Sequence, residues 1–266
     1  YHSDFLGGII AKLFINCKII WTIHCSKPIF DKTKFTTYCI YRINAILSYF
    51  IPKLIIYCSE TGRNDHEEIG FDKAKSQIIE NGIEINKFAF SQQKRKLFRD
   101  SFSIKENVFL IGMVSRFDPL KDHETLLKSL NLLKKRKSIK FNCIFAGKNI
   151  HHKNYKLVNL IEKYQLEEEI ILMGESEDIV SVMCGIDCHV LSSHSEAAPN
   201  VIFEAMACLT FTISSDVGDI RKIVNNRGLI FESGNYEELY KSLVFTFKNV
   251  FKNKEKKVSH DSREYI

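Results

Sequence analysis

Glycine and proline are scarce in this sequence, with 12 Gly and 4 Pro among 266 residues. That scarcity excludes a collagen-like or low-complexity chain, and a hydrophobic content of 45% excludes a disordered one. The length is enough for two compact domains. The sequence therefore predicts a globular protein that buries a sizeable core.

Long apolar runs and a secretory signal are also lacking. The apolar stretch 43–52 lies between Arg42 and Lys53 and has about half of the roughly 20 residues that span a bilayer. We therefore expect no transmembrane anchor. The charge excess is modest, because 38 Lys and Arg oppose 32 Asp and Glu. A net charge of +6 suits anionic ligands or a membrane surface without selecting either.

The eight cysteines lack the grouping of a metal site. Most lie inside apolar runs, as Cys143 does in Phe-Asn-Cys-Ile-Phe, where a free thiol behaves as a small hydrophobe. We therefore expect reduced thiols and a cytoplasmic protein. Cys184 and Cys188 form the closest pair, but no second pair at zinc spacing accompanies them, so we expect no metal.

Short runs rich in Val, Ile and Phe alternate with amphipathic segments from about residue 105 onward. This alternation predicts βα units on a parallel sheet, and six strands make a complete doubly wound domain. An example of the helical pattern is 122–135, with leucines at helical spacing. The predicted strands are 108–114, 141–146, 170–173, 188–192, 210–214 and 228–231.

The first hundred residues repeat this alternation less completely. We predict a partial Rossmann-like domain over 1–95, a complete one over 96–250 and a basic tail over 251–266, with 91–100 as a polar connector. We expect the first half of the first domain to lie outside this sequence. The elements predicted in the first part are helices at 4–14 and 33–50 and strands at 19–23, 54–59 and 76–79.

A helix begins directly after one of the predicted strands, in the segment 195–207. Pro199 suits the first helical position, where its missing N–H has no cost. Ala198 cannot cap with its side chain, so the first-turn N–H groups, around Asn200 and Val201, remain free. Such a helix tip after a parallel strand is a ready phosphate site.

Two carboxylates accompany this helix. Glu204 lies in an otherwise apolar helix, and a buried carboxylate needs partners, either a structural hydrogen bond or the hydroxyls of a sugar or ribose. Glu196 lies eight residues earlier, roughly 12 Å away at a helical rise of ~1.5 Å. That exceeds the ~5–9.5 Å between the paired carboxylates of a glycoside hydrolase, so we do not expect them to attack one bond together.

Two cations follow the first strand of the predicted complete domain. Arg116 and Lys121 lie in the loop at the carboxyl end of that strand, where open α/β sheets bind ligands. Together they would neutralise a diphosphate, and Arg can hold two oxygens at once. The alternative is an ordinary solvated loop, since Lys and Arg are common on surfaces.

Two segments in combination resemble the retaining glycosyltransferases of family 4, which have the GT-B fold. They are Ser-Arg-Phe-Asp-Pro-Leu-Lys-Asp-His at 115–123 and Glu196-x7-Glu204, and the resemblance covers about residues 105–245. Segments 21–26 and 79–83 are similar, more weakly, to the second half of the acceptor domain. The resemblance implies an α/β, GT-B-like fold with one complete and one partial Rossmann-like domain.

The resemblance also implies roles for the candidate residues. Arg116 and Lys121 would hold the donor diphosphate, and the backbone of 198–201 would contact phosphates and sugar. Glu196 would touch the transferred sugar, Glu204 would bind the ribose hydroxyls, and His24 would face the sugar from the other domain. The reaction would be metal-independent transfer from a nucleotide-diphosphate sugar, with no cofactor and with retention of anomeric configuration. The acceptor would be a glycan or lipid-linked saccharide of the cell envelope.

The sequence departs from the family pattern just after the predicted helix that contains Glu204. Ala207-Cys208-Leu209-Thr210 stands where members often have Gly and Pro, which leaves a noncatalytic sugar-nucleotide-binding fragment as the alternative. A nicotinamide dehydrogenase is excluded because no G-x-G-x-x-G follows a strand. We expect no nucleic acid, since basic runs 134–137 and 248–257 lack interleaved aromatic platforms.

The basic stretch 248–257, with Phe247 and Phe251, is also a candidate for contact with an anionic inner membrane face. A solvated helix end is the competing interpretation.

Overall fold

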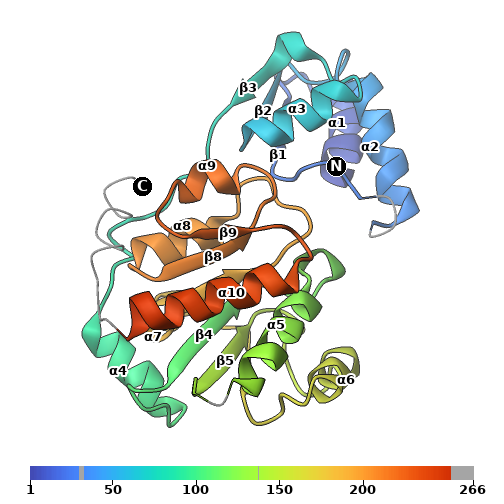
Figure 1. Cartoon of the computed structure of the whole chain (residues 1–266). Coiled ribbons are helices and arrows are strands. Elements are labelled where there is room, and N and C mark those ends of the chain that lie inside the picture. The colour runs from blue at the N-terminus through green and yellow to red at the C-terminus, as the bar shows by residue number, and fades with distance from the viewer. Residues whose placement is uncertain (30–32, 137, 253–266) are drawn as a thin grey trace. The chain divides into compact units, whose positions relative to one another are not determined.

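The structure, a computed structural model, describes residues 1–29, 33–136 and 138–252. It divides into two compact units, which Figure 1 shows. Unit 1 comprises Tyr1–Gly82 with the short segments Ser195–Pro199 and Val217–Ile220, and unit 2 comprises the remaining residues. Each unit is built on its own parallel sheet, as alternating strands and helices require.

Unit 1 has a three-stranded sheet in the order β1-β2-β3. Its core is rich in aromatic rings, with Trp21, Tyr41, Tyr57 and Phe71 buried. The strands and helices predicted here are confirmed, with bounds that differ by at most three residues. The elements are α1 (His2–Phe14), β1 (Ile20–Ile23), α2 (Phe35–Leu47), β2 (Leu54–Tyr57), α3 (Glu60–Glu68), the 3₁₀ turn η2 (Lys73–Lys75) and β3 (Ser76–Ile78).

Unit 2 has a six-stranded parallel sheet in the order β6-β5-β4-β7-β8-β9. All six predicted strands are confirmed to within one residue at either end. The strands are β4 (Phe109–Val114), β5 (Phe141–Ala146), β6 (Ile170–Gly174), β7 (Cys188–Leu191), β8 (Phe211–Ser215) and β9 (Leu229–Phe231). The helices are α4 (Gln92–Ser101), η3 (Pro119–Lys121), α5 (His123–Lys135), α6 (Tyr155–Lys163), α7 (Ile179–Gly185), α8 (Asn200–Ala207), α9 (Ile220–Val224), α10 (Tyr236–Thr246) and η4 (Phe247–Phe251).

Helices cover both faces of this sheet, so its strands are buried on both sides. In β4, Phe109 and Ile111 belong to a core shared with α5 and α10, which lie side by side. Leu110, between them, belongs to a second core shared with α4 and α7. Alternate residues of a strand point to opposite faces, so a continuously apolar strand is the expected sequence of a doubly covered sheet.

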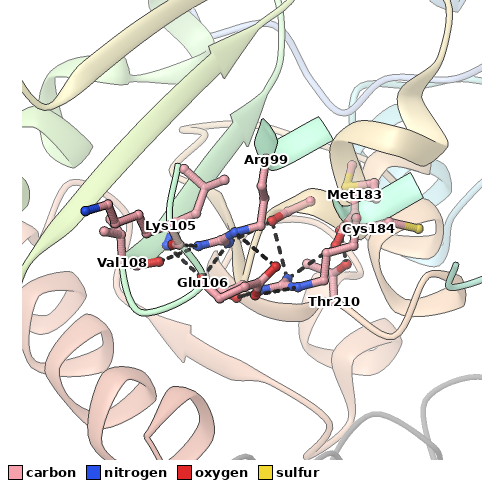
Figure 2. A network of polar contacts seen from close by, with 11 residues as sticks. Arg99, Lys105, Glu106, Val108, Met183, Cys184 and Thr210 are labelled. Atoms are coloured by element: carbon pink, nitrogen blue, oxygen red, sulfur yellow. Dashed lines mark hydrogen bonds and ion pairs between the residues drawn. The ribbon is translucent and has the colours of Figure 1, made fainter. Parts of the chain in front are cut away.

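The predicted polar connector at 91–100 is wrong, because these residues form helix α4. Ser91 caps the helix by accepting a hydrogen bond from the Lys94 N–H at 3.2 Å. Arg99 is only 1% exposed, and its guanidinium donates to the carbonyls of Lys105 and Val108 at 2.8 and 2.6 Å (Figure 2). Arg99 therefore holds this helix against the domain, and the segment is not a solvated linker.

The aromatic residues of the predicted membrane contact near the carboxyl end face the protein interior. Phe247 is buried in the core of unit 2, and Phe251 stacks on it with ring centroids 5.6 Å apart. Both rings also pack against Phe109. The expectation that Phe247 and Phe251 rest on a membrane is therefore wrong, and most of the predicted tail 251–266 lies outside the described residues.

Three histidines are buried in these cores. Burial lowers the pKa of His66 to about 4 and the pKa values of His123 and His189 to about 3, from 6.5. Neither ring nitrogen of His189 has a hydrogen-bond partner within the described residues. These side chains therefore stay neutral in the folded state at pH values where the unfolded chain binds protons.

We expect the free energy of unfolding to fall as pH drops from about 6.5 toward 4. Each buried histidine contributes a loss of roughly 1.4 kcal/mol per pH unit in this range. The pKa of each histidine is lower in the folded state than in the unfolded state, so the unfolded state binds more protons in this pH range. Lowering the pH therefore favours unfolding. Replacing His189 by leucine should flatten this slope in urea titrations between pH 7.5 and 4.5. The exposed His152→Leu serves as the matched control, and equal slopes in the two variants would contradict the assignment.

Candidate functional site

The sheet of unit 2 has a topological switch point between β4 and β7. From β4 the chain passes through α5 to β5 on one side, while β7 pairs with β4 on the other side. The loops that leave these two neighbouring strands therefore run in opposite directions from a common edge. In open α/β sheets this crevice at the carboxyl ends of the strands is where ligands bind.

The loop after β4 carries the two predicted cations. Asp118 caps η3 by accepting from the Leu120 N–H at 2.9 Å, and its other carboxylate oxygen lies 3.3 Å from the Arg116 Nε. Arg116 is anchored at this one end, and its side chain remains 55% exposed. Lys121 ends η3 and is half-buried. The loop thus presents both cations at the carboxyl edge of the sheet, where the sequence predicted them.

A close approach of two loops supports this arrangement. Gly147, directly after β5, has a φ of +142°, and a Cβ there would lie 2.3 Å from the Ser115 carbonyl oxygen. Only glycine fits so near the backbone that leads into Arg116. The predicted cation loop is therefore fixed from the neighbouring strand as well as by Asp118.

Polar residues after β7 join its loop to the loop after β4. The His194 N–H donates to the Leu120 carbonyl at 2.8 Å, and its Nε2 lies 3.1 Å from the Asp122 carboxylate. The Ser192 hydroxyl donates to the Asp122 carbonyl, also at 2.8 Å. Asp122 in turn caps α5 from a left-handed backbone conformation, with φ of 49°. These contacts hold the two edges of the crevice together.

Sequence analysis did not identify Ser192, His194 and Asp122 as site residues. The signal was present in the polar run Ser-Ser-His that follows the fully buried strand β7. A run of polar residues directly after a buried strand has to find hydrogen-bond partners, because unpaired polar groups are costly in a protein interior.

Helix α8 begins at Asn200, so the prediction of Pro199 as its first residue is wrong by one position. Ile202, Ala205 and Met206 are buried, as the apolar pattern predicted. Glu204 is half-buried instead of fully buried. Desolvation raises the pKa of its carboxyl group, while the positive charge of Lys87 acts in the opposite direction. This carboxylate is poorly solvated, which suits a group that completes its hydrogen bonds with a ligand.

The predicted site residues divide between the two units. Arg116 and Lys121 in the loop after β4, and Glu204 in the helix after β7, all belong to unit 2, as do Asn200 and Val201. His24, Glu196, Ala198 and Pro199 belong to unit 1. Within unit 1, the hydroxyl of Ser26, two residues after the exposed His24, donates to the Glu196 carbonyl. The roles of all these residues stay predictions.

The described residues contain no group of three or more His, Cys, Asp or Glu side chains suited to a metal ion. All eight cysteines are free thiols. Across the described ranges we also find no helix that combines the length and apolarity needed to cross a membrane.

Family comparison extends across the whole of the candidate site in unit 2. Residues 94–264, more than half of the chain, match the family described as glycosyl transferases group 1. The chain belongs to this family. The match includes Arg116, Lys121, Glu196 and Glu204 as well as most of the helix α4 that precedes β4.

Curated relatives of this glycosyltransferase chain come from bacteria. It is 24% identical over 249 residues to UDP-Gal:alpha-D-GlcNAc-diphosphoundecaprenol alpha-1,3-galactosyltransferase of Escherichia coli, covering 91% of this chain and 63% of the relative. It is similarly 24% identical over 240 residues to the O-antigen biosynthesis glycosyltransferase WclY of Escherichia coli, covering 88% and 64%. The chain therefore spans slightly less than two thirds of the length of these relatives.

Solved structures share the fold. HepE of Anabaena in complex with UDP and glucose has a TM-score of 0.84 at 19% identity, covering all of this chain and 71% of that one. Sucrose-phosphate synthase of Thermosynechococcus elongatus has a TM-score of 0.81 at 17% identity, covering 99% and 67%. These likenesses confirm the predicted α/β, GT-B-like fold with Rossmann-like domains.

Proposed function

We propose that this glycosyltransferase moves a sugar from a nucleotide-diphosphate donor to a saccharide or lipid-linked acceptor of the cell envelope. The observation that carries the proposal is the placement of Arg116 and Lys121 in the loop after β4, at the β4–β7 switch point. The neighbouring strand, β7, leads into α8. Membership of the family supports it. The names of the relatives, which include a UDP-galactose donor and a diphosphoundecaprenol acceptor, support the same substrate classes.

The proposed donor site uses charge and backbone together. Arg116 and Lys121 bind the diphosphate, and the backbone of Ala198, Pro199, Asn200 and Val201 contacts its phosphates and the sugar. Cations and free N–H groups at a helix tip are suited to phosphate oxygens. Glu204 accepts hydrogen bonds from the ribose hydroxyls, which would relieve the poor solvation of its carboxylate.

The proposed reaction is the retaining, metal-independent transfer of the family 4 enzymes. The bond between the anomeric carbon and the diphosphate oxygen breaks, and its electron pair stays on the diphosphate. The acceptor hydroxyl attacks the oxocarbenium-like sugar on the face from which the diphosphate leaves, and it gives its proton to the departing phosphate oxygen. Arg116 and Lys121 stabilise the charge that develops there. Glu196 and His24 contact the transferred sugar as the catalytic residues.

A noncatalytic sugar-nucleotide-binding fragment stays the alternative, raised by the departure of Ala207-Cys208-Leu209-Thr210 from the family pattern. Single-turnover transfer assays would compare this chain with one extended at its amino end to the length of the relatives. Transfer by both chains supports the enzyme. Transfer by the extended chain alone, together with a thermal shift of the 266-residue chain by the donor, would support the fragment that binds the donor without acting on it.

A thermal-shift panel of nucleotide sugars tests the donor site. At about 100 times its Kd a ligand adds roughly 2.7 kcal/mol to stability, which corresponds to a rise in Tm of about 5–10 °C. We expect Glu204→Gln to reduce the shift given by the best nucleotide sugar. The exposed Glu162→Gln on α6 is the matched control. A full shift in the Glu204 variant would contradict the assignment of the nucleoside site.

The same variant has a second expected effect without ligand. Because desolvation raises the folded pKa of Glu204, the ionised carboxylate destabilises the fold at neutral pH. The ligand-free Glu204→Gln protein should therefore melt at a higher temperature than wild type at pH 8. This difference should fade as the pH falls toward 4.5, the ordinary pKa of a Glu side chain. Loss of ligand shift with gain of ligand-free stability separates a binding role from a structural one.

We also propose that the enzyme is cytoplasmic and contacts the inner membrane face, because an acceptor such as diphosphoundecaprenol is held in a membrane. The segment 248–257 can supply positive charge, of which Lys248 and Lys252 lie within the described residues. Of the aromatic residues beside them, Phe247 is buried and Phe251 is partly buried against the same core, so within the described residues this segment offers no free aromatic anchor.

A further inference from the structure

Helix α2 of unit 1 is apolar on two opposite faces. One face packs into the core, where Tyr41 and Ala45 are buried. The other face carries an exposed stripe of large apolar side chains, Phe35, Ile43 and Ile46, which continues to Phe50 just after the helix. Ile46 is 65% exposed and Phe50 is 69% exposed. An amphipathic helix of a globular protein normally turns polar residues to water, so the second apolar face indicates a binding surface.

The stripe borders a groove of about 680 Å³ between the end of α2 and the end of α3. We call this groove with the stripe the α2 surface. Its volume lies within the ~300–1,000 Å³ typical of ligand sites. Apolar side chains make up most of the lining, and Arg42 is its one charged residue. The lining residues are Arg42, Ile43, Ala45, Ile46, Tyr49, Phe50, Ile69 and Gly70.

The segment that carries the exposed stripe has charged residues of one sign. From Thr33 to Ser59 the sequence has three basic residues, Lys34, Arg42 and Lys53, and no acidic one. Within the described part of the chain, Arg42 has no carboxylate at ion-pair distance. The acidic residues beside the other wall of the groove have basic partners, with Glu67 at 3.8 Å from Arg63, Asp72 at 3.4 Å from Lys75 and Glu68 at 4.0 Å from Lys27.

We propose that the α2 surface docks on an anionic phospholipid bilayer, with Ile46 and Phe50 entering the acyl region and Arg42 binding lipid phosphate. Interfacial helices combine this apolar face with basic residues at its edge. Tyr49 suits the boundary between headgroups and acyl chains, and Lys53 is long enough to reach the headgroups. The inference extends the membrane contact of the proposed function, and vesicle binding can be measured without any sugar transfer.

A second copy of the chain fits this surface less well. A two-fold interface through the α2 surface places the same residues of both copies together. The 33–59 segment offers no acidic residue to pair with Arg42 of the other copy, and the acidic residues beside the groove, Glu67, Glu68 and Asp72, already have basic partners. An anionic bilayer supplies the missing negative charge over the whole face.

Co-sedimentation of the full chain with phosphatidylcholine vesicles containing one quarter phosphatidylglycerol tests the proposal. We expect the double variant Ile46→Glu, Phe50→Glu to weaken binding at least about tenfold, because the two apolar side chains that enter the bilayer are replaced by charged ones. Arg42→Glu should weaken binding to these vesicles and leave any binding to pure phosphatidylcholine unchanged. The matched control is Leu97→Glu on α4, an apolar residue 62% exposed in unit 2.

The substituted side chains are exposed, so the variants should keep the wild-type Tm and the wild-type thermal shift with a nucleotide sugar. Those readings separate a failure of this inference from a failure of the proposed donor site. Binding of the double variant within twofold of wild type would overturn the proposal, as would loss of binding in Leu97→Glu. A wild-type dimer in vesicle-free light scattering that the double variant dissociates would assign the surface to a second copy instead.

Discussion

Replacing Arg116 by alanine is expected to lower kcat for sugar transfer by about 100- to 1,000-fold, the usual loss when one preorganised charge contact to a transition state is removed. The guanidinium is positioned by Asp118 and is otherwise exposed at the carboxyl edge of the sheet. Negative charge on the diphosphate increases as the sugar leaves, so the contact strengthens along the reaction. The loss should therefore appear in kcat more than in KM.

Arg136→Ala provides the matched control, because this exposed arginine just after α5 binds the Tyr240 hydroxyl, away from the β4 and β7 loops. Steady-state kinetics with the donor identified by thermal shift would measure both variants. Arg116→Lys should recover part of the activity, since lysine keeps the charge but cannot bind two oxygens in a fork. A kcat within twofold of wild type in Arg116→Ala would remove the diphosphate role from this residue.

The strands of unit 2 could be predicted from sequence because both faces of their sheet are covered. A strand such as Phe109–Val114 is then a short continuous apolar run that stands out between polar loops. The edge of the sheet at which we expect a ligand followed from strand direction alone. The positions of Arg116 and Lys121 were therefore predictable without any knowledge of how the strands are ordered.

Helices α3 and α4 were not predictable from hydrophobic periodicity. The sequence of α3, Glu60–Glu68, contains no large apolar residue, and it packs through the buried Gly62 and the neutral ring of His66. Helix α4 has few apolar residues and packs through Phe98 and the guanidinium of Arg99. A buried charge has the same sequence letter as a solvated one, so the distinction depends on partners that are distant in sequence.

The connection between the loops after β4 and β7 was missed for the same reason. His194 and Asp122 are 72 positions apart in sequence, yet their side chains meet at 3.1 Å. Single-residue properties indicate that each can form hydrogen bonds, but not with which partner. The strand order, with β7 beside β4, is the information that joins them.

Replacing Arg99 by methionine is expected to lower the free energy of unfolding by roughly 3–5 kcal/mol, the usual result of removing one partner of a buried ion pair. The Arg99 guanidinium lies 3.2 Å from the carboxylate of Asp187, the residue directly before β7. It also donates to the carbonyls of Lys105, Val108 and Gly185. Methionine fills a similar volume, but these carbonyls would lose a donor, and Asp187 would keep only Arg95 and the Leu110 N–H.

The matched control is Lys94→Met on the same helix, where the ammonium pairs with Asp178 at 2.9 Å in solvent. Exposed pairs contribute at most about 1 kcal/mol, so this variant should unfold close to wild type in urea. The Arg99 network lies at the amino ends of β4 and β7, at the opposite edge of the sheet from Arg116. Arg99→Met should therefore bind the donor with unchanged affinity at temperatures where it remains folded. Equal stability of the two variants would mean that α4 is held by its apolar contacts alone.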